Sequence, residues 1–139
     1  MDLYSAIALI TAALLVVTVV DVCHNRLADH STTVKCIVVC ISIGLALLCE
    51  WACVRLNGAP SALIGLHRAV KTAEFCLAPV TGVLAAHAYS RIKRSIAIVS
   101  AIVALHAAFQ IAACHSGLVL YIDEANVYHR GKLYWIYIV

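Results

Sequence analysis

Four long apolar stretches dominate the chain, and short polar segments separate them. A helix crosses about 30 Å of hydrocarbon with roughly 20 residues, because each residue rises about 1.5 Å. Four stretches reach or approach this length, so the pattern predicts an all-α integral membrane protein with a four-helix transmembrane bundle. The expected helices cover residues 3–20, 36–54, about 68–89 and 95–114.

The segment that follows the fourth apolar stretch, residues 118–132, has a different pattern. Two β-prone runs lie on either side of Asp123 and Asn126, which are residues that favour turns. We therefore expect a short β-hairpin in this segment. A last apolar run, residues 133–139, predicts the start of a fifth helix.

Composition supports a membrane protein. Apolar residues make up 64% of the 139 residues and charged residues only 12%, against about 45–50% and 25% in soluble domains. So few charges cannot solvate a surface of this size, and lipid must cover much of it. Residues 1–139 are therefore expected to form a single transmembrane domain whose main partner is the lipid bilayer.

The distribution of basic residues predicts the orientation. Arg26 and Lys35 flank the first connection, and the third connection contains Arg91, Lys93 and Arg94. Cytoplasmic loops carry an excess of Lys and Arg, so these two connections are expected in the cytoplasm. The chain is then a multi-pass protein of the cell membrane with an extracytoplasmic N-terminus and an extracytoplasmic hairpin.

Two carboxylates interrupt the outer parts of the apolar helices. In this orientation Glu50 and Glu74 lie about 6–9 Å below the outer edge of the hydrocarbon, on neighbouring helices. A charge at that depth is costly unless it is paired or faces water, and Arg68, Lys71 and Arg55 are the candidate partners. These side chains form either an ion-pair network that fixes helix packing or a pocket for an unknown small external ligand.

The histidines and cysteines do not predict a metal or haem site. Only His67 and His115 match in depth, as two axial haem ligands must. Two cysteine pairs at i, i+4 spacing point to nearly opposite faces of one helix and cannot form one four-cysteine site. We expect no metal, no cofactor and no catalytic residue, and scattered basic residues with a net charge of +3 do not favour nucleic acid as a partner.

The third and fourth helices carry residues that bear on packing. Pro79 removes a backbone donor and predicts a kink in the third helix. On the fourth helix, Ser100, Ala104, Ala108 and Ala112 form a face of small residues that lets another helix approach closely. We interpret this face as packing within the chain, and a homodimer interface is the alternative.

The segment from Tyr121 to Gly131, Tyr-Ile-Asp-Glu-Ala-Asn-Val-Tyr-His-Arg-Gly, resembles the extracytoplasmic motif of bacterial multi-helix sensor modules. These modules stand in front of GGDEF diguanylate cyclases or multi-transmembrane histidine kinases. Glu50 late in the second helix and Pro79 in the third are also similar to that family, so the resemblance extends over essentially the whole chain. A proline usually follows the Arg-Gly pair in the family, whereas Lys132 follows it here. The resemblance implies the amino-terminal portion of a receptor and lends no cyclase or kinase activity.

Together these features predict a signal-sensing input module of a bacterial receptor, without enzyme activity, that relays an external signal to a cytoplasmic output domain. In it the hairpin is either a lid over the carboxylates or a cap, and Arg130 pairs with Asp123 or Glu50. The alternative is a small homo-oligomeric proton-coupled transporter or channel that uses an intramembrane carboxylate. The expected sensing residues are Glu50, Arg68, Lys71, Glu74, Tyr121, Asp123, Asn126, Tyr128, Arg130 and Gly131.

Overall fold

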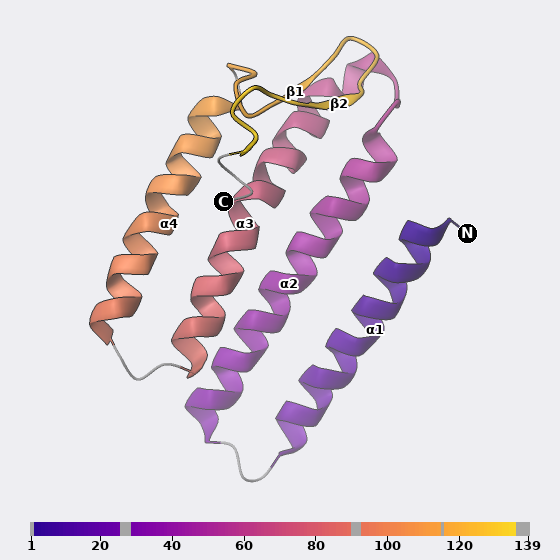
Figure 1. Ribbon diagram of the computed structural model, residues 1–139. Helices are drawn as coiled ribbons and strands as arrows, with labels where there is room; N and C mark the ends of the chain where they lie inside the picture. Colours follow the sequence, from indigo (N-terminus) through magenta and orange to yellow (C-terminus); the bar gives the residue numbers. More distant parts are fainter. Residues whose placement is uncertain (1, 26–28, 90–92, 115, 136–139) are drawn as a thin grey trace.

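The computed structural model describes residues 2–25, 29–89, 93–114 and 116–135, which form four long helices and a two-stranded sheet (Figure 1). All four helices are long and apolar enough to cross a membrane, which confirms the expected multi-pass helical protein. The elements are α1 (Leu3–His24), α2 (His30–Leu56), the short 3-10 helix η1 (Ser61–Leu63), α3 (Ile64–Tyr89), α4 (Lys93–Ala113), β1 (Leu120–Ile122) and β2 (Tyr128–Arg130).

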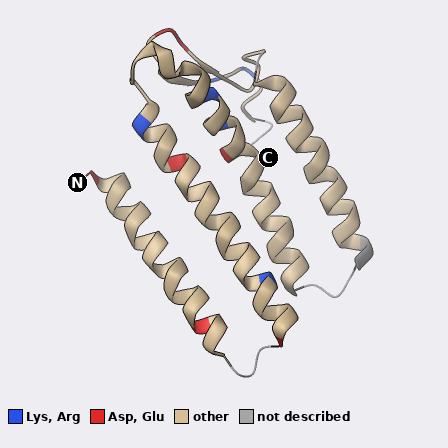
Figure 2. Ribbon diagram, turned by 180° about the vertical axis from the view of Figure 1, so that it is seen from behind, with Lys and Arg blue, Asp and Glu red and all other residues tan. Residues whose placement is uncertain are grey.

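The first two helices extend beyond the apolar stretches that predicted them. At its start α1 is capped by Asp2, whose carboxylate accepts a hydrogen bond of 2.7 Å from the Ser5 backbone N–H. Near its end α1 includes Asp21, which lies beyond the predicted stretch 3–20, and near its start α2 includes Lys35, which lies before the predicted stretch 36–54. In Figure 2 most of the coloured charges of the helices lie towards their two ends, and Glu74 of α3 is an acidic residue further inside a helix. This distribution suits helices whose ends reach the lipid headgroups and water.

The helices form one layer instead of the closed bundle that we expected. The principal contacts join consecutive helices, α1 to α2, α2 to α3 and α3 to α4, and Figure 1 shows the four side by side in this order. The accessible surface is 9148 Å², whereas a compact soluble protein of 14.9 kDa exposes about 7,000 Å². The layer therefore leaves broad apolar faces for lipid.

The most buried side chains lie at one end of this layer and not in its middle. We call this end, where α2 ends, α3 begins and the β1–β2 hairpin lies, the hairpin end. Val119, Leu120 and Asn126 of the hairpin segment are 1%, 1% and 0% exposed, and His67 of α3 is 1% exposed. By contrast, Leu14 in the middle of α1 is 62% exposed. Tight packing is thus concentrated where the hairpin covers the helices.

The strands confirm the predicted hairpin. They pair antiparallel, with Leu120 opposite Arg130 and Ile122 opposite Tyr128. Beyond β2 the chain turns back, because the backbone N–H of Leu133 donates to the carbonyl of Leu118 at 2.8 Å. The structure describes only the first three residues of the expected fifth helix, 133–135, and the rest of that helix lies outside the described residues.

Near the middle of the layer, a pair of hydroxyl groups joins α2 to α3. The Ser42 and Thr81 hydroxyl oxygens are 2.6 Å apart, and Thr81 also donates to the Leu77 carbonyl one turn earlier. Pro79 lies within α3, which continues through it to Tyr89. A buried polar contact in an apolar layer fixes the rotation of one helix against the other.

The small-residue face of α4 does not pack within the chain as we expected. Ala104, Ala108 and Ala112 are exposed, because α4 turns Gln110 and Ala113 towards the rest of the protein instead. The homodimer alternative stays a prediction.

The fold leads to a first prediction, at Gly131. A β-carbon at this position would overlap the Leu118 carbonyl, because the two backbone segments approach closely here. Substitution Gly131→Ala is expected to destabilise the hairpin by about 2 kcal/mol through overpacking, measured as faster amide hydrogen exchange in residues 118–133. The control is Gly65→Ala in α3, where nothing lies within 4 Å of the added methyl. Equal exchange in the two variants would contradict the close approach.

Candidate functional site

The hairpin is fastened to the helices by the side chain of Asn126. Its amide nitrogen donates to the backbone carbonyls of Leu56 and Ala59 at 2.9 and 3.1 Å. Its amide oxygen lies 2.9 Å from Nδ1 of His67. Because both amide hydrogens are directed to carbonyls, the oxygen must accept, so His67 carries its proton on Nδ1. One buried side chain therefore connects the hairpin, the end of α2 and the first turn of α3.

The backbone of Asn126 adds to this attachment. Asn126 has a φ of 59°, a left-handed conformation that asparagine tolerates better than most residues. In this conformation its carbonyl accepts a hydrogen bond of 2.9 Å from the N–H of Gly58. Two residues further along the chain, the backbone N–H of Tyr128 donates to the side-chain oxygen of Asn57 at 2.9 Å. The turn between α2 and α3 and the hairpin thus satisfy each other's backbone groups.

Asp123 shapes the hairpin turn itself. Its carboxylate accepts hydrogen bonds from the N–H groups of Ala125 and Val127 at 3.0 and 2.9 Å, and His129 Nε2 lies 2.7 Å away. The His129 ring stacks on Tyr121, with 4.9 Å between ring centroids. The backbone hydrogen bond from Val127 and the contact with His129 hold the pKa of Asp123 below its ordinary value. Asp123, Tyr121 and His129 therefore serve the shape of the hairpin.

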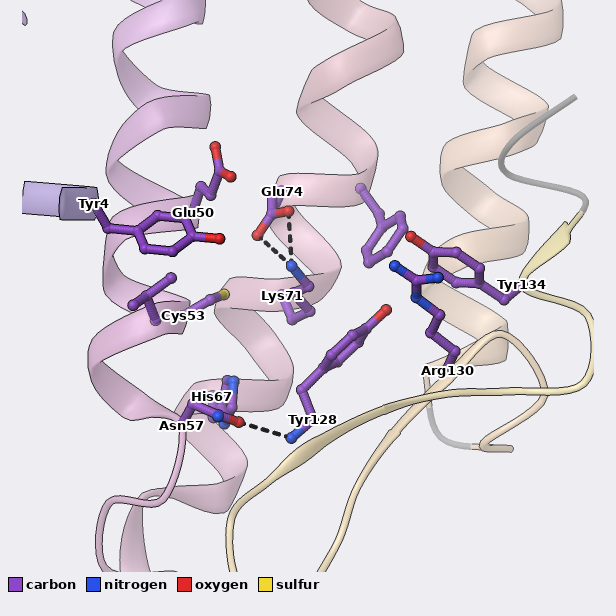
Figure 3. A pocket seen from close by; sticks show the side chains of 12 residues that line it. Tyr4, Glu50, Cys53, Asn57, His67, Lys71, Glu74, Tyr128, Arg130 and Tyr134 are labelled. Atoms are coloured by element: carbon purple, nitrogen blue, oxygen red, sulfur yellow. Dashed lines mark hydrogen bonds and ion pairs between the residues drawn. The ribbon is translucent and has the colours of Figure 1, made fainter. Parts of the chain in front are cut away.

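A cavity of about 550 Å³ lies beneath the hairpin (Figure 3). It is bounded by α1, the end of α2, α3, the hairpin and Tyr134, which follows the hairpin. Its volume is within the range typical of sites for small molecules. The lining residues are Tyr4, Glu50, Cys53, Val54, Asn57, His67, Lys71, Glu74, Phe75, Tyr128, Arg130 and Tyr134.

An ion pair crosses the α3 wall of the cavity. Lys71 Nζ lies 2.8 and 2.9 Å from the two carboxylate oxygens of Glu74, and the side chains are only 15% and 22% exposed. The ammonium group also lies 4.9 Å from the ring centroid of Tyr128 and 5.4 Å from that of Phe75. The carboxylate and the two rings together compensate the partial burial of the Lys71 charge.

Glu50 and Arg130 also line the cavity, but they are not paired with each other or with another charge. Within the part of the chain that the structure describes, neither has an ion-pair partner. The Arg130 guanidinium lies 4.7 Å from the ring centroid of Tyr134, which in turn packs edge-on against Phe75. In Figure 3 Glu50 and Tyr4 are on one side of the Lys71–Glu74 pair, and Arg130 and Tyr134 are on the other. The cavity lining thus includes one carboxylate, of Glu50, and one guanidinium, of Arg130, that are not engaged in an ion pair among the described residues.

Two predicted pairings differ from those in the structure. Arg130 was expected to pair with Asp123 or Glu50, but Asp123 is engaged by His129 on the hairpin. Arg55, a candidate partner of the helix carboxylates, instead lies 3.1 Å from Asp2 and donates to the Ser5 hydroxyl at 2.8 Å. Arg55 therefore attaches the start of α1 to the end of α2.

The structure brings together five of the ten expected sensing residues around the cavity. Those five are Glu50, Lys71, Glu74, Tyr128 and Arg130. Tyr121, Asp123, Asn126 and Gly131 shape or fasten the hairpin, and Arg68 contributes only its carbonyl, which accepts from the Thr72 hydroxyl. Arg68 is not among the residues that line the cavity, because helix rotation directs positions 71 and 74, one turn apart, into it instead. The expected sensing role of Arg68 stays a prediction.

Several lining residues had no signal in the sequence. They include Tyr4 of α1, Asn57 at the end of α2 and Tyr134 after β2. In the sequence, His67 was considered only as a depth-matched partner of His115, which lies outside the described residues. These residues meet only because the hairpin folds back over the helices.

The described residues contain no group of three or more His, Cys, Asp or Glu side chains that is arranged to hold a metal ion. Each of the seven cysteines has a free thiol, and Cys53 alone among them lines the cavity. No family model, curated protein or solved structure matches the chain. The function is therefore argued from the geometry of the hairpin end.

The fastening of the hairpin gives a second prediction, at Asn126. Both Asn126→Gly and Asn126→Ala remove the side-chain hydrogen bonds to the Leu56 and Ala59 carbonyls and to His67. Asn126→Gly is expected to speed amide exchange in the hairpin roughly 30-fold, equivalent to about 2 kcal/mol. Alanine should cost about 1 kcal/mol more than glycine, because it resists a positive φ. The control is Glu124→Ala at an exposed position of the same turn. Wild-type exchange in the glycine variant would show that the side chain does not fasten the hairpin.

A third prediction concerns acid. Because the folded turn lowers the pKa of Asp123 from its ordinary value of 3.8, the carboxylate stabilises the hairpin above that pH. This stabilisation is lost as pH falls below about 3.8, through the lowered pKa. The amide resonances of Ala125 and Val127 should therefore shift in an NMR titration from pH 6 to 2, with a midpoint below 3.8. Asp123→Asn keeps an acceptor oxygen but should abolish the titration. A midpoint at or above 3.8 would contradict the hydrogen bonding.

Proposed function

We propose that the chain is a membrane-embedded input module of a bacterial signalling receptor, and that its cavity binds a small extracytoplasmic ligand. The observation that carries this proposal is the cavity that lies beneath the hairpin fastened by Asn126. Its lining includes two charged side chains, Glu50 and Arg130, that have no ion-pair partner among the described residues. Charged groups that line a cavity and are not engaged in an ion pair are available to bind a ligand.

The placement of the cavity supports a relay. Its walls come from α1 through Tyr4, from α2 through Glu50, from α3 through Lys71, and from the hairpin through Arg130. A ligand that contacts four separate segments at once binds best to one arrangement of them, and binding shifts the population towards that arrangement. Because the helices form one layer with few cross-contacts, a change at the hairpin end shifts their tilts.

The resemblance of the Tyr121–Gly131 segment to sensor modules suggests what receives the signal: a diguanylate cyclase or a histidine kinase on the cytoplasmic side. In this proposal the hairpin end faces the extracytoplasmic space and the first and third connections face the cytoplasm. The hairpin acts as a lid whose attachment is set by Asn126. The module itself performs no covalent chemistry.

The position of the charges favours sensing over transport. A transport path needs polar groups that extend to the midplane, often between inverted repeats. The cavity lies at the hairpin end and not at the middle of the layer. Near the middle, the Ser42 and Thr81 hydroxyls are hydrogen-bonded to each other. Proton flux in proteoliposomes that is abolished by Glu50→Gln would favour the transporter alternative.

The proposal predicts that cavity substitutions change signalling. The chain is fused at its carboxyl end, through an apolar segment that completes the expected fifth helix, to a diguanylate cyclase domain, and cellular cyclic di-GMP is measured. Glu50→Ala and Arg130→Ala are expected to change the output about fivefold or more, because coupling energies of 1–3 kcal/mol are typical. The control Glu124→Ala, at a position outside the cavity, should leave cyclic di-GMP unchanged.

Membrane insertion and expression level of every variant are measured in parallel by fractionation. Unchanged cyclic di-GMP in both cavity variants, at normal insertion, would overturn the proposed role.

A further inference from the structure

We propose that the ligand of this cavity is a small zwitterion, of which a free amino acid is the simplest kind, with its ammonium group at Glu50 and its carboxylate at Arg130. This inference rests on the proposed function for its biological meaning, but it concerns binding alone and is tested separately. It follows from the charge balance, the geometry and the size of the cavity.

The charges of the lining residues cancel. Two acidic side chains, Glu50 and Glu74, face two basic ones, Lys71 and Arg130. Lys71 and Glu74 satisfy each other at 2.8 Å, which leaves one negative and one positive group for a ligand. A dianion would pair with Arg130 and leave Glu50 beside a like charge, and a dication would do the reverse. Only a molecule with both charges pairs with Glu50 and Arg130 at the same time.

The two groups are placed for such a molecule. The Arg130 guanidinium carbon lies 4.7 Å from the ring centroid of Tyr134, and a guanidinium can bind a carboxylate with two parallel N–H groups. Glu50 and Tyr4 both line the cavity and are on the same side of the Lys71–Glu74 pair in Figure 3. The Glu50 carboxylate suits an ammonium group, whose charge is opposite. The Lys71–Glu74 pair lies between these two subsites. The ligand therefore spans the pair instead of breaking it.

The remaining walls fit the uncharged part of such a ligand. A volume of about 550 Å³ is far larger than a metal ion or an inorganic anion needs, and it lies within the usual range for small organic ligands. Phe75 and Tyr128 supply aromatic surface next to the charged groups, and Val54 supplies an aliphatic one. This mixture favours an amino acid whose side chain is apolar or aromatic.

The experiment measures binding to the purified chain in lipid nanodiscs by isothermal titration. The probes are the twenty standard amino acids, and for any binder its N-acetyl derivative and its amide, each of which removes one of the two charges. At least one amino acid is expected to bind with a Kd of about 1 mM or tighter. Both derivatives should bind about tenfold more weakly or worse.

Substitutions assign each charge to its subsite. Glu50→Gln should weaken the amino acid about tenfold but leave the N-acetyl derivative unchanged, so that the preference for the free amine disappears. Arg130→Gln should remove the preference for the free carboxylate over the amide in the same way. The controls Glu124→Gln and Lys132→Gln change one acid and one base at exposed positions outside the cavity and should alter neither preference. A variant that merely misfolds would weaken all probes together.

The outcomes separate this inference from the proposed function. The inference is overturned if no amino acid binds the folded chain, or if removing either charge of the binder leaves its affinity unchanged. It is also overturned if glutarate or 1,5-diaminopentane, probes with two like charges, binds more tightly than every amino acid. Cyclic di-GMP that responds to cavity substitutions in the fusion protein would still support the sensor role in those cases. An amino acid that binds but never alters cyclic di-GMP would support the inference and count against the sensor role.

Discussion

The side chain of Asn126 is the contact on which the organisation of this protein depends. It is fully buried and makes hydrogen bonds to the end of α2, to the turn before η1 and to His67 of α3. A buried amide without these partners would be costly, so the hairpin is stable in one position only. That position carries Tyr128 and Arg130 over the Lys71–Glu74 pair and closes the cavity. The hairpin is thus held by polar contacts whose geometry is specific, whereas apolar packing alone would tolerate several arrangements.

This contact is important because the helices of the protein pack mainly against their neighbours in sequence. A single layer of helices has no common core, and residues such as Leu14 remain exposed to lipid. Between lipid and protein there is little hydrophobic gain from bringing helices together, so packing and hydrogen bonds must hold them. The Ser42–Thr81 contact does this for α2 and α3, and the Asp2–Arg55 pair does it for α1 and α2. The best-packed region is therefore the hairpin end, which is also where the cavity lies.

Charged residues near that end divide into two kinds. Asp2 with Arg55, Asp123 with His129, and Lys71 with Glu74 are paired and serve the structure. Glu50 and Arg130 line the cavity without a charge partner among the described residues, and the proposed ligand site rests on them. The sequence shows all of these acidic and basic residues, but it does not indicate which of them are paired with each other and which line the cavity without a partner. The Lys71–Glu74 ion pair lies in the wall of the proposed ligand site, so the two roles that we treated as alternatives are compatible.

Hydropathy along the chain determined the four long apolar helices and the hairpin, because these depend on local composition and on the length needed to cross a bilayer. The tertiary structure alone decided that the helices form a layer, that Lys71 and not Arg68 meets Glu74, and that Arg130 reaches the cavity. Those outcomes depend on the rotation of each helix about its axis and on where the hairpin folds back. The rotation of the helices and the fold-back of the hairpin are set by a few hydrogen bonds between residues up to 71 positions apart, which leave no periodic signal in the sequence.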